Sequence, residues 1–375
     1  MSNTLTYEQL KVMVGDIVTA AKLSNGTYSV SRNNVAELVD KIGKIFSIDT
    51  NFRQDKLARF NAEFLSYGKT VEEYQADLLE VRDFTGEGTN ALVSDSGTFR
   101  PPFYSYTIGR KFVKQTIPYG NLERAVHFAA EYVNIIALMY SRIEDSIAQY
   151  EYELKREALG RLAGLCATAM GTTTTFAIST AYDVGDYVRK GSSGDDAKVK
   201  GIVFKPIAAT NTDAWAAAVA AGKIVPIDLE EVLSVPTDEA SGEAFIERVK
   251  ALAEVASDRN QGNSLNGNCL GVTTDLVLIV KQGILPNLQV KTMAGCFQLD
   301  QLALPAEVIV VPDFGDDGGN TWGILMDGRG LMLHPTYRAS RELLNPESDK
   351  LAIYTHVEHT IQASRNTFIH VFKSA

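Results

Sequence analysis

Residues Leu122–Leu154, LERAVHFAAEYVNIIALMYSRIEDSIAQYEYEL, carry the strongest structural signal in the chain. Their apolar residues recur at alternating steps of four and three, which aligns them along one side of an α-helix. This stripe consists of Leu122, Val126, Ala129, Val133, Ile136, Tyr140, Ile143, Ile147, Tyr150 and Leu154. It predicts one helix of roughly 38 residues, about 57 Å long. The residues that we expect to be its core are Val133, Ile136, Tyr140, Ile143 and Ile147.

The ends of this helix and its packing partner follow from neighbouring residues. Asn121 is suited to cap the start of the helix, and Gly160 and Gly164 are expected to loosen its end. The repeat also permits a coiled coil. A small residue, Ala129, and two tyrosines in the stripe favour packing against a β-sheet instead.

The chain before this helix has two parts. Two amphipathic helices are predicted in residues 6–23 and 31–46. Residues 48–118 then form a turn-rich, charged segment of about seventy residues without an apolar face, and such a segment is either disordered or held by a partner. Inside it, residues 103–108 and 112–117 read as strands, and Gly109-Arg110-Lys111 predicts a hairpin turn between them.

The chain after the helix mixes short helices and strands, which predicts an α+β fold. A β-hairpin is expected around the glycine-rich tip 191–196, between residues 182–188 and 199–204. Helices are expected at 214–221 and 242–256, and buried strands at 276–280, 307–312 and 322–326. The last two strands, 352–357 and 367–372, are expected to pair with each other.

The charge balance argues against a nucleic-acid binder. Lys and Arg number 36 against 46 Asp and Glu, so the net charge is −10, whereas phosphate binding needs a surplus of cations. Two stretches depart from this average. Residues 100–114 carry four bases and no acid, and residues 292–328 carry six acids and no base.

Each charged stretch is either a solvated surface or one half of a contact between copies of the protein. Aromatic residues among the bases also permit a platform on which single-stranded bases stack, although four bases in an acidic chain are few. The candidate subunit-interface residues are therefore Arg100, Phe103, Tyr104, Arg110, Lys111, Lys114, Asp313, Asp316 and Asp317.

Signatures of catalysis, cofactor binding and metal binding are missing from the sequence. It contains no complete P-loop, no nucleophile elbow and no calcium loop. His356 and His359 would point to opposite sides of a strand, which is poor geometry for one metal. The three cysteines are far apart, which fits a reducing cytoplasm, and no stretch is apolar enough to span a membrane. We expect no catalytic residue, no cofactor and no metal.

The order of these segments resembles the major capsid proteins of tailed bacteriophages, which have the Hong Kong 97-type fold. Three stretches look like members with podovirus-type heads. They are Gly68–Tyr74 (GKTVEEY), Thr274–Ile279 (TDLVLI) and Asn366–Phe372 (NTFIHVF). The resemblance covers about residues 48–375, and its motifs are loose patterns whose weight lies in their order.

The resemblance implies a division of the chain into five parts. These are an N-terminal helical arm (1–47), an E-loop (48–118), a P-domain with the spine helix and a β-hairpin extension at 176–207 (119–211), an inserted α/β A-domain (212–325), and P-domain return strands (326–375). The extension is less typical of the family.

The resemblance also implies a function. The protein would be a structural subunit that assembles with itself, as pentamers and hexamers, into an icosahedral shell around double-stranded DNA. Scaffolding and portal proteins would be its partners, and it would assemble in the host bacterial cytoplasm without membrane contact. Two alternatives remain at this point: an encapsulin-like shell that holds protein cargo, and a soluble α/β enzyme.

Overall fold

A computed structural model describes residues 55–66, 68–73, 75–76, 99–100, 105–118, 129–258, 260–269, 273–284, 305–345 and 350–374. Its helices and 3₁₀ turns are η1 (Ala58–Phe60), α4 (Ala129–Met170), η2 (Gly194–Ala197), α5 (Trp215–Ala220), α6 (Glu239–Ser257) and η4 (Asp316–Gly318). Its strands are β1 (Gln75–Ala76), β2 (Phe99–Arg100), β3 (Ser105–Pro118), β4 (Tyr187–Arg189), β5 (Lys200–Val203), β6 (Ile224–Ile227), β7 (Glu230–Val232), β8 (Asn260–Gln261), β9 (Asn268–Cys269), β10 (Leu276–Lys281), β11 (Glu307–Val311), β12 (Thr321–Asp327), β13 (Leu331–Asn345), β14 (Lys350–Ala363) and β15 (Ile369–Lys373).

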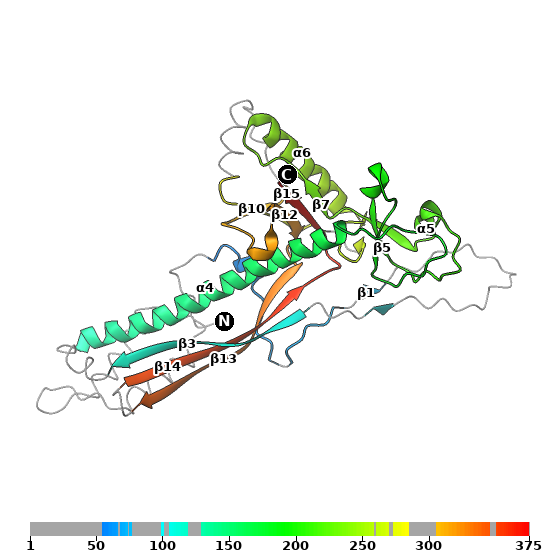
Figure 1. The fold of residues 1–375 in the computed structure, drawn as a ribbon. Helices are drawn as coiled ribbons and strands as arrows, with labels where there is room; N and C mark the ends of the chain where they lie inside the picture. Colours follow the sequence, from blue (N-terminus) through cyan, green and yellow to red (C-terminus); the bar gives the residue numbers. More distant parts are fainter. Residues whose placement is uncertain are drawn as a thin grey trace, which may run out of the picture.

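The long helix α4 runs through most of the length of the described structure, and the sheets lie beside it (Figure 1). The prediction of one long helix is confirmed, and so is its packing on a sheet, because α4 contacts β3, β13 and β14. The predicted end is wrong, since the helix continues to Met170. Its apolar stripe continues with it, through the buried residues Ala158, Leu159, Leu162, Ala163, Cys166 and Ala169. The proposed cap, Asn121, lies outside the described residues.

The glycines that were expected to loosen α4 have a different role. A β-carbon on Gly160 would lie 1.9 Å from the carbonyl oxygen of Phe314, far inside van der Waals contact. One on Gly164 would lie 3.4 Å from the carbonyl oxygen of Asp317. The connection between β11 and β12, which includes η4, therefore rests against α4 where the helix has no side chain at Gly160.

The long sheet has the order β13–β14–β3 and is antiparallel throughout. The expected hairpin at 103–117 is wrong, because residues 105–118 form one continuous strand. Val357 pairs with Lys111 but His359 pairs with Ile108, so β3 carries one extra residue there. The turn signal around Gly109 thus marks a β-bulge. Residues 105–118 also need no partner molecule, since β14 of the same chain holds them.

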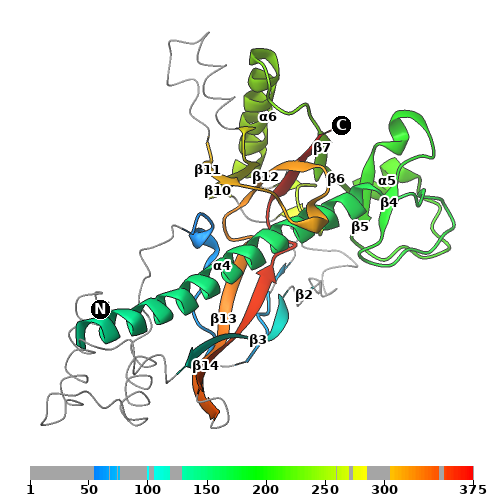
Figure 2. The same ribbon diagram turned by 60° about the vertical axis from the view of Figure 1, so that its left-hand side comes forward.

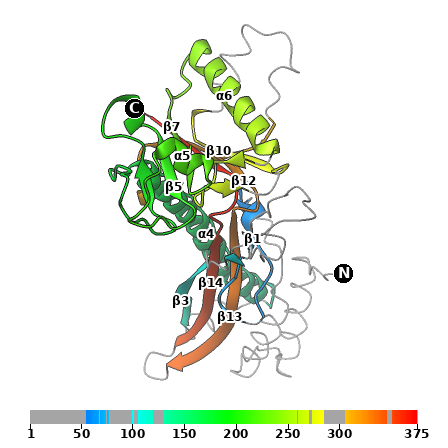
Figure 3. The same ribbon diagram turned by 90° about the vertical axis from the view of Figure 1, so that its right-hand side faces the viewer.

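The second sheet has five strands in the order β11–β10–β12–β15–β7 and lies between α4 and α6 (Figure 3). Alternate residues of β10 face the two helices. Val277 and Ile279 join the core under α4, whereas Leu278 and Val280 join the core under α6. The predicted strands at 276–280, 307–312 and 322–326 are confirmed.

The expected pairing of the last two strands is wrong. Strand β14 lies in the middle of the long sheet, and β15 lies between β12 and β7 in the second sheet. Residues 364–368 between them carry the chain from one sheet to the other, as residues 328–330 do between β12 and β13.

A third, small sheet stands at the end of α4 (Figure 2). It has the order β4–β5–β6, and its β4–β5 hairpin confirms the one predicted around residues 191–196. Helix α5, predicted at 214–221, packs on it. Its separate hydrophobic core consists of Phe176, Tyr182, Val188, Val203, Ile207, Ala218 and Ile224.

Candidate subunit interface

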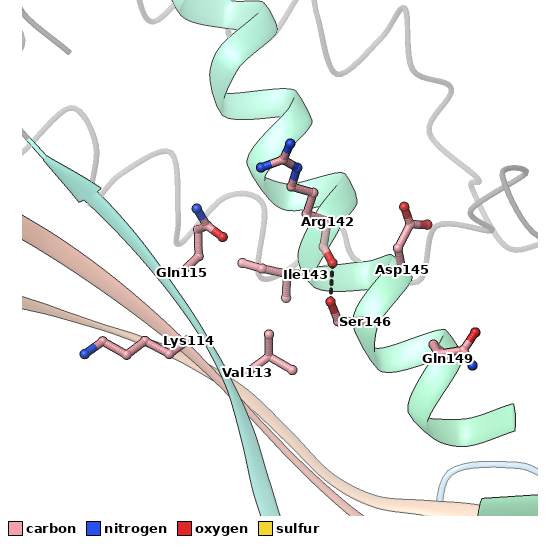
Figure 4. Close-up of a pocket in the computed structure, with 8 residues that line it drawn as sticks. All are labelled: Val113, Lys114, Gln115, Arg142, Ile143, Asp145, Ser146 and Gln149. Atoms are coloured by element: carbon pink, nitrogen blue, oxygen red, sulfur yellow. Dashed lines mark hydrogen bonds between the residues drawn. The ribbon is translucent and has the colours of Figure 1, made fainter. Parts of the chain in front are cut away.

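The long sheet has one covered face and one open face. On β14, Ile353, Val357 and Ile361 point towards α4 and are 1%, 3% and 2% exposed. Figure 4 shows the same alternation on β3, where Val113 points towards Ile143 of α4 and Lys114 points away from the helix. We call the side turned away from α4 the open face. Beyond the bulge it carries Arg110, Phe112, Lys114, Tyr337, Arg341, Leu343, Tyr354 and His356.

Cations and aromatic rings alternate across the open face. The guanidinium of Arg110 lies 3.9 Å from the ring centre of Tyr337, and the ammonium of Lys114 lies 5.4 Å from that of Tyr354. Phe112 lies between the rings of Tyr354 and His356, at 5.7 and 5.8 Å. Such cation–π contacts help to hold the two cations in position on the open face.

At the other end of the open face, the buried carboxylate of Glu358 connects β3 and β14 to residues 68–73. Glu358 is 3% exposed and forms ion pairs with Lys69 and Arg110. The hydrogen bond from Lys69 holds the pKa of Glu358 below its ordinary value, against the opposing effect of burial. The carbonyl oxygen of Lys69 accepts hydrogen bonds from Thr360 Oγ1 at 2.7 Å and Thr107 Oγ1 at 3.0 Å. Residues 68–73 are thus fastened to the open face by polar contacts, which we call the clasp.

The clasp yields a first prediction. Glu358→Gln should raise hydrogen exchange in residues 69–73 by about tenfold or more, because the ammonium of Lys69 loses its charged partner. Mass spectrometry of the exchanged protein measures this, and Glu247→Gln on the exposed side of α6 is the matched control. Acid should have the same effect. The stabilisation is complete above the ordinary carboxyl pKa of about 4.3 and is lost as the pH falls through the lowered pKa of Glu358. Unchanged exchange in the variant would contradict the clasp.

Polar side chains also fasten α4 to its surroundings. Lys155 is 1% exposed, pairs with Asp55 and donates to Asn61 Oδ1 at 2.7 Å. His359 Nε2 lies 2.9 Å from Glu151 Oε1. Glu144 pairs with Arg338, yet burial raises the pKa of Glu144. Sequence reasoning missed these contacts because the partners are far apart in the chain, as are His359 and Glu151 at 208 positions.

The structure places the predicted basic residues on different sides of one strand. Arg110 and Lys114 lie on the open face, whereas Lys111 pairs with Val357 and lies on the α4 side. Arg100 lies in β2 with its side chain outside the described set, and Phe103 and Tyr104 lie outside the described residues.

The predicted acidic residues have partners within the same chain. Asp313 pairs with Arg156 at 3.3 Å, and Asp317 pairs with Arg161 at 3.6 Å, both on α4. Asp316 begins η4 beside them. These ion pairs help to hold the β11–β12 connection on the helix, so Asp313 and Asp317 are less available to a second copy than the sequence indicated.

Two of the predicted helix-core residues have described side chains, and both are buried. Ile143 and Ile147 are 3% and 2% exposed. Val133, Ile136 and Tyr140 lie on α4, but their side chains fall outside the described set.

A groove of about 430 Å³ opens where β3 and α4 diverge (Figure 4). It is lined by Val113, Lys114, Gln115, Arg142, Ile143, Asp145, Ser146 and Gln149. These residues include no cysteine or histidine, and the serine hydroxyl donates to the carbonyl oxygen of Arg142 at 2.7 Å. The groove therefore has no activated nucleophile.

The described residues contain neither a metal-binding cluster nor a membrane-spanning helix. They contain no group of three His, Cys, Asp or Glu side chains arranged to hold a metal ion. None of the described helices is both long and apolar enough to cross a membrane. Cys166 is fully buried, and burial raises the pKa of its thiol to about 12, so the thiol stays protonated at neutral pH.

The arrangement of a long helix against two sheets matches solved phage capsids. The capsid structure of Staphylococcus phage Andhra aligns with a TM-score of 0.53 at 11% identity, over 84% of this chain and 83% of that one. That of cyanophage P-SCSP1u aligns with 0.50 at 9% identity, over 84% and 86%. A chain in the structure of the head fiber and inner core protein gp22 of native bacteriophage P68 aligns with 0.51 at 12% identity, over 84% and 83%. No curated protein sequence matches the chain.

These likenesses define the class: the fold is the α+β Hong Kong 97-type fold of phage capsid subunits. The sequence identifies the family within this class, because residues 16–373 match the family described as Phi29-like phage major capsid protein. The chain belongs to this family of major capsid proteins. It is a structural protein of the virion shell and not an enzyme.

Proposed function

We propose that this subunit assembles as pentamers and hexamers into an icosahedral shell that encloses double-stranded phage DNA. The observation that carries this proposal is the family match, which extends over residues 16–373. The net charge of −10 supports a wall that holds DNA without gripping it, because like charges repel across the interior.

Partners and location follow from the same proposal. Scaffolding and portal proteins would direct assembly in the host bacterial cytoplasm, and DNA would be enclosed without sequence-specific contacts. We also propose that the chain divides into five parts, with boundaries after residues 47, 118, 211 and 325. In it, the residues of β3 connect the E-loop to the sheet that the return strands build.

Electron microscopy of the expressed protein tests this function. We expect closed shells, or rings and sheets of subunits, in negative stain after expression in bacteria. Particles should protect double-stranded DNA from nuclease when packaging partners are co-expressed. A small, monodisperse oligomer would contradict assembly, and particles that hold a protein cargo in place of DNA would favour an encapsulin-like shell.

A further inference from the structure

The open face beyond the bulge combines exposed apolar side chains with positive charge. Phe112 and Leu343 are 57% and 58% exposed there, and among the described residues the clasp covers only the opposite end, around Thr107 and Thr360. An exposed aromatic and an exposed leucine on one sheet face give a partner two apolar contact points beside the charges of this face.

The charge of this surface opposes that of the whole chain. Arg110, Lys114 and Arg341 lie on the open face, and the carboxylate that the described strands bring near them is Glu358, which is buried and already paired. The chain nevertheless has a net charge of −10. The open face is therefore a basic, partly apolar area on an acidic protein, and its charge is opposite to the net charge of a second copy.

We propose that the open face beyond the bulge receives an acidic surface of a second copy of this chain. This inference rests on the proposed assembly and assigns one of its contacts to Arg110, Phe112, Lys114, Arg341 and Leu343. Exposed acids on a second copy exist in the described part of the chain, for example Glu243, Glu247 and Glu254 along the outer side of α6. Because two different surfaces meet, the contact is heterologous, and repetition of such contacts builds rings and shells.

A single-stranded nucleic acid is a poorer occupant of the same surface. Bases bind such proteins by stacking on open aromatic rings. Here the side chains of Arg110 and Lys114 already lie over the rings of Tyr337 and Tyr354. Two of the aromatic rings therefore already carry a cation, and Phe112 is left as the exposed ring on which a base could stack. The cations and the exposed Leu343 suit a protein surface better than a strand of stacked bases.

Charge reversal on one side of β3 tests the proposal with a matched control. The test variant is Lys114→Glu combined with Arg341→Glu, both exposed and on the open face. The control is Lys111→Glu, which is exposed on the same strand but on the α4 side. Particle yield is measured by sedimentation at 50 and 500 mM salt, and thermal melting checks that each subunit is folded. If the test variant melts early, Lys114→Gln with Arg341→Gln replaces it.

We expect the test variant to lower particle yield by about tenfold or more, because like charges brought together across a contact cost several kcal/mol. The control should change the yield by less than about twofold, and the wild-type yield should fall as salt screens the contact. Provided that the wild type forms shells, either of two results overturns the inference. One is a normal particle yield from the test variant, and the other is an equal loss of particle yield in the control. Absence of wild-type shells would instead refute the proposed function.

A last measurement separates the two classes of occupant. Wild-type subunit is titrated against a fluorescent single-stranded DNA of thirty nucleotides. We expect no binding at 150 mM salt. Binding that the test variant abolishes and the control retains would assign the open face to nucleic acid and overturn the inference.

Discussion

Gly160→Ala is expected to destabilise the subunit by about 1–3 kcal/mol or more, the cost of forcing an extra group into a packed site. In most helix interiors the same change stabilises by about 0.5–1 kcal/mol. At Gly160 the substitution is destabilising instead, because the added β-carbon would lie 1.9 Å from the carbonyl oxygen of Phe314. That oxygen belongs to backbone, so the whole β11–β12 connection has to move away from α4.

Gly164→Ala is the matched control, four residues further along the same helix. Its β-carbon would lie 3.4 Å from the carbonyl oxygen of Asp317, close to ordinary contact. We expect it to be neutral or slightly stabilising. Urea unfolding of the two variants measures the difference in the free energy of unfolding. Equal effects of the two substitutions would show that the connection does not rest on α4 at Gly160.

Ile143→Asp is expected to abolish soluble, folded protein. Ile143 is 3% exposed, and a carboxylate placed there loses most of its hydration. The expected loss is several kcal/mol, which is a large part of the stability of an ordinary domain.

The control for this variant lies on the same turn of α4. Ser146 is exposed, so Ser146→Asp adds the same charge without burying it. It should melt within a few degrees of the wild type by circular dichroism. An Ile143→Asp variant that melts at the wild-type temperature would show that the predicted stripe is not a core.

Local sequence patterns predicted most helices and strands of the fold. Contacts between residues far apart in the chain determined where α4 ends and whether Gly109 forms a turn or a bulge. The periodicity of Leu122–Leu154 identified α4, but its extension to Met170 depends on core residues supplied by both sheets. Gly109 resembled a turn because a glycine in a strand signals either a turn or a bulge. Pairing with β14, whose residues lie far along the chain, selected the bulge.

The candidate interface was predicted in part for the same reason. Alternation along a strand separates Lys111 from Lys114, but only after residues 105–118 are known to be one strand. Charge composition identified Asp313 and Asp317, although it gave no sign that Arg156 and Arg161 pair with them. The clasp had no local signal at all, since Lys69 and Thr360 are 291 positions apart.

The positions of β14 and β15 have a consequence for synthesis on the ribosome. Strand β14 is the central strand of the long sheet, and β15 lies inside the second sheet between β12 and β7. A nascent chain that stops before Lys350 lacks an inner strand of both sheets at once, and α4 has neither sheet complete to pack against. Completion of both sheets therefore waits until residues 350–374 have left the exit tunnel, which makes this step late and dependent on distant contacts. Chains that end before Lys350 are therefore expected to lack the native shape and to stay out of an assembled shell.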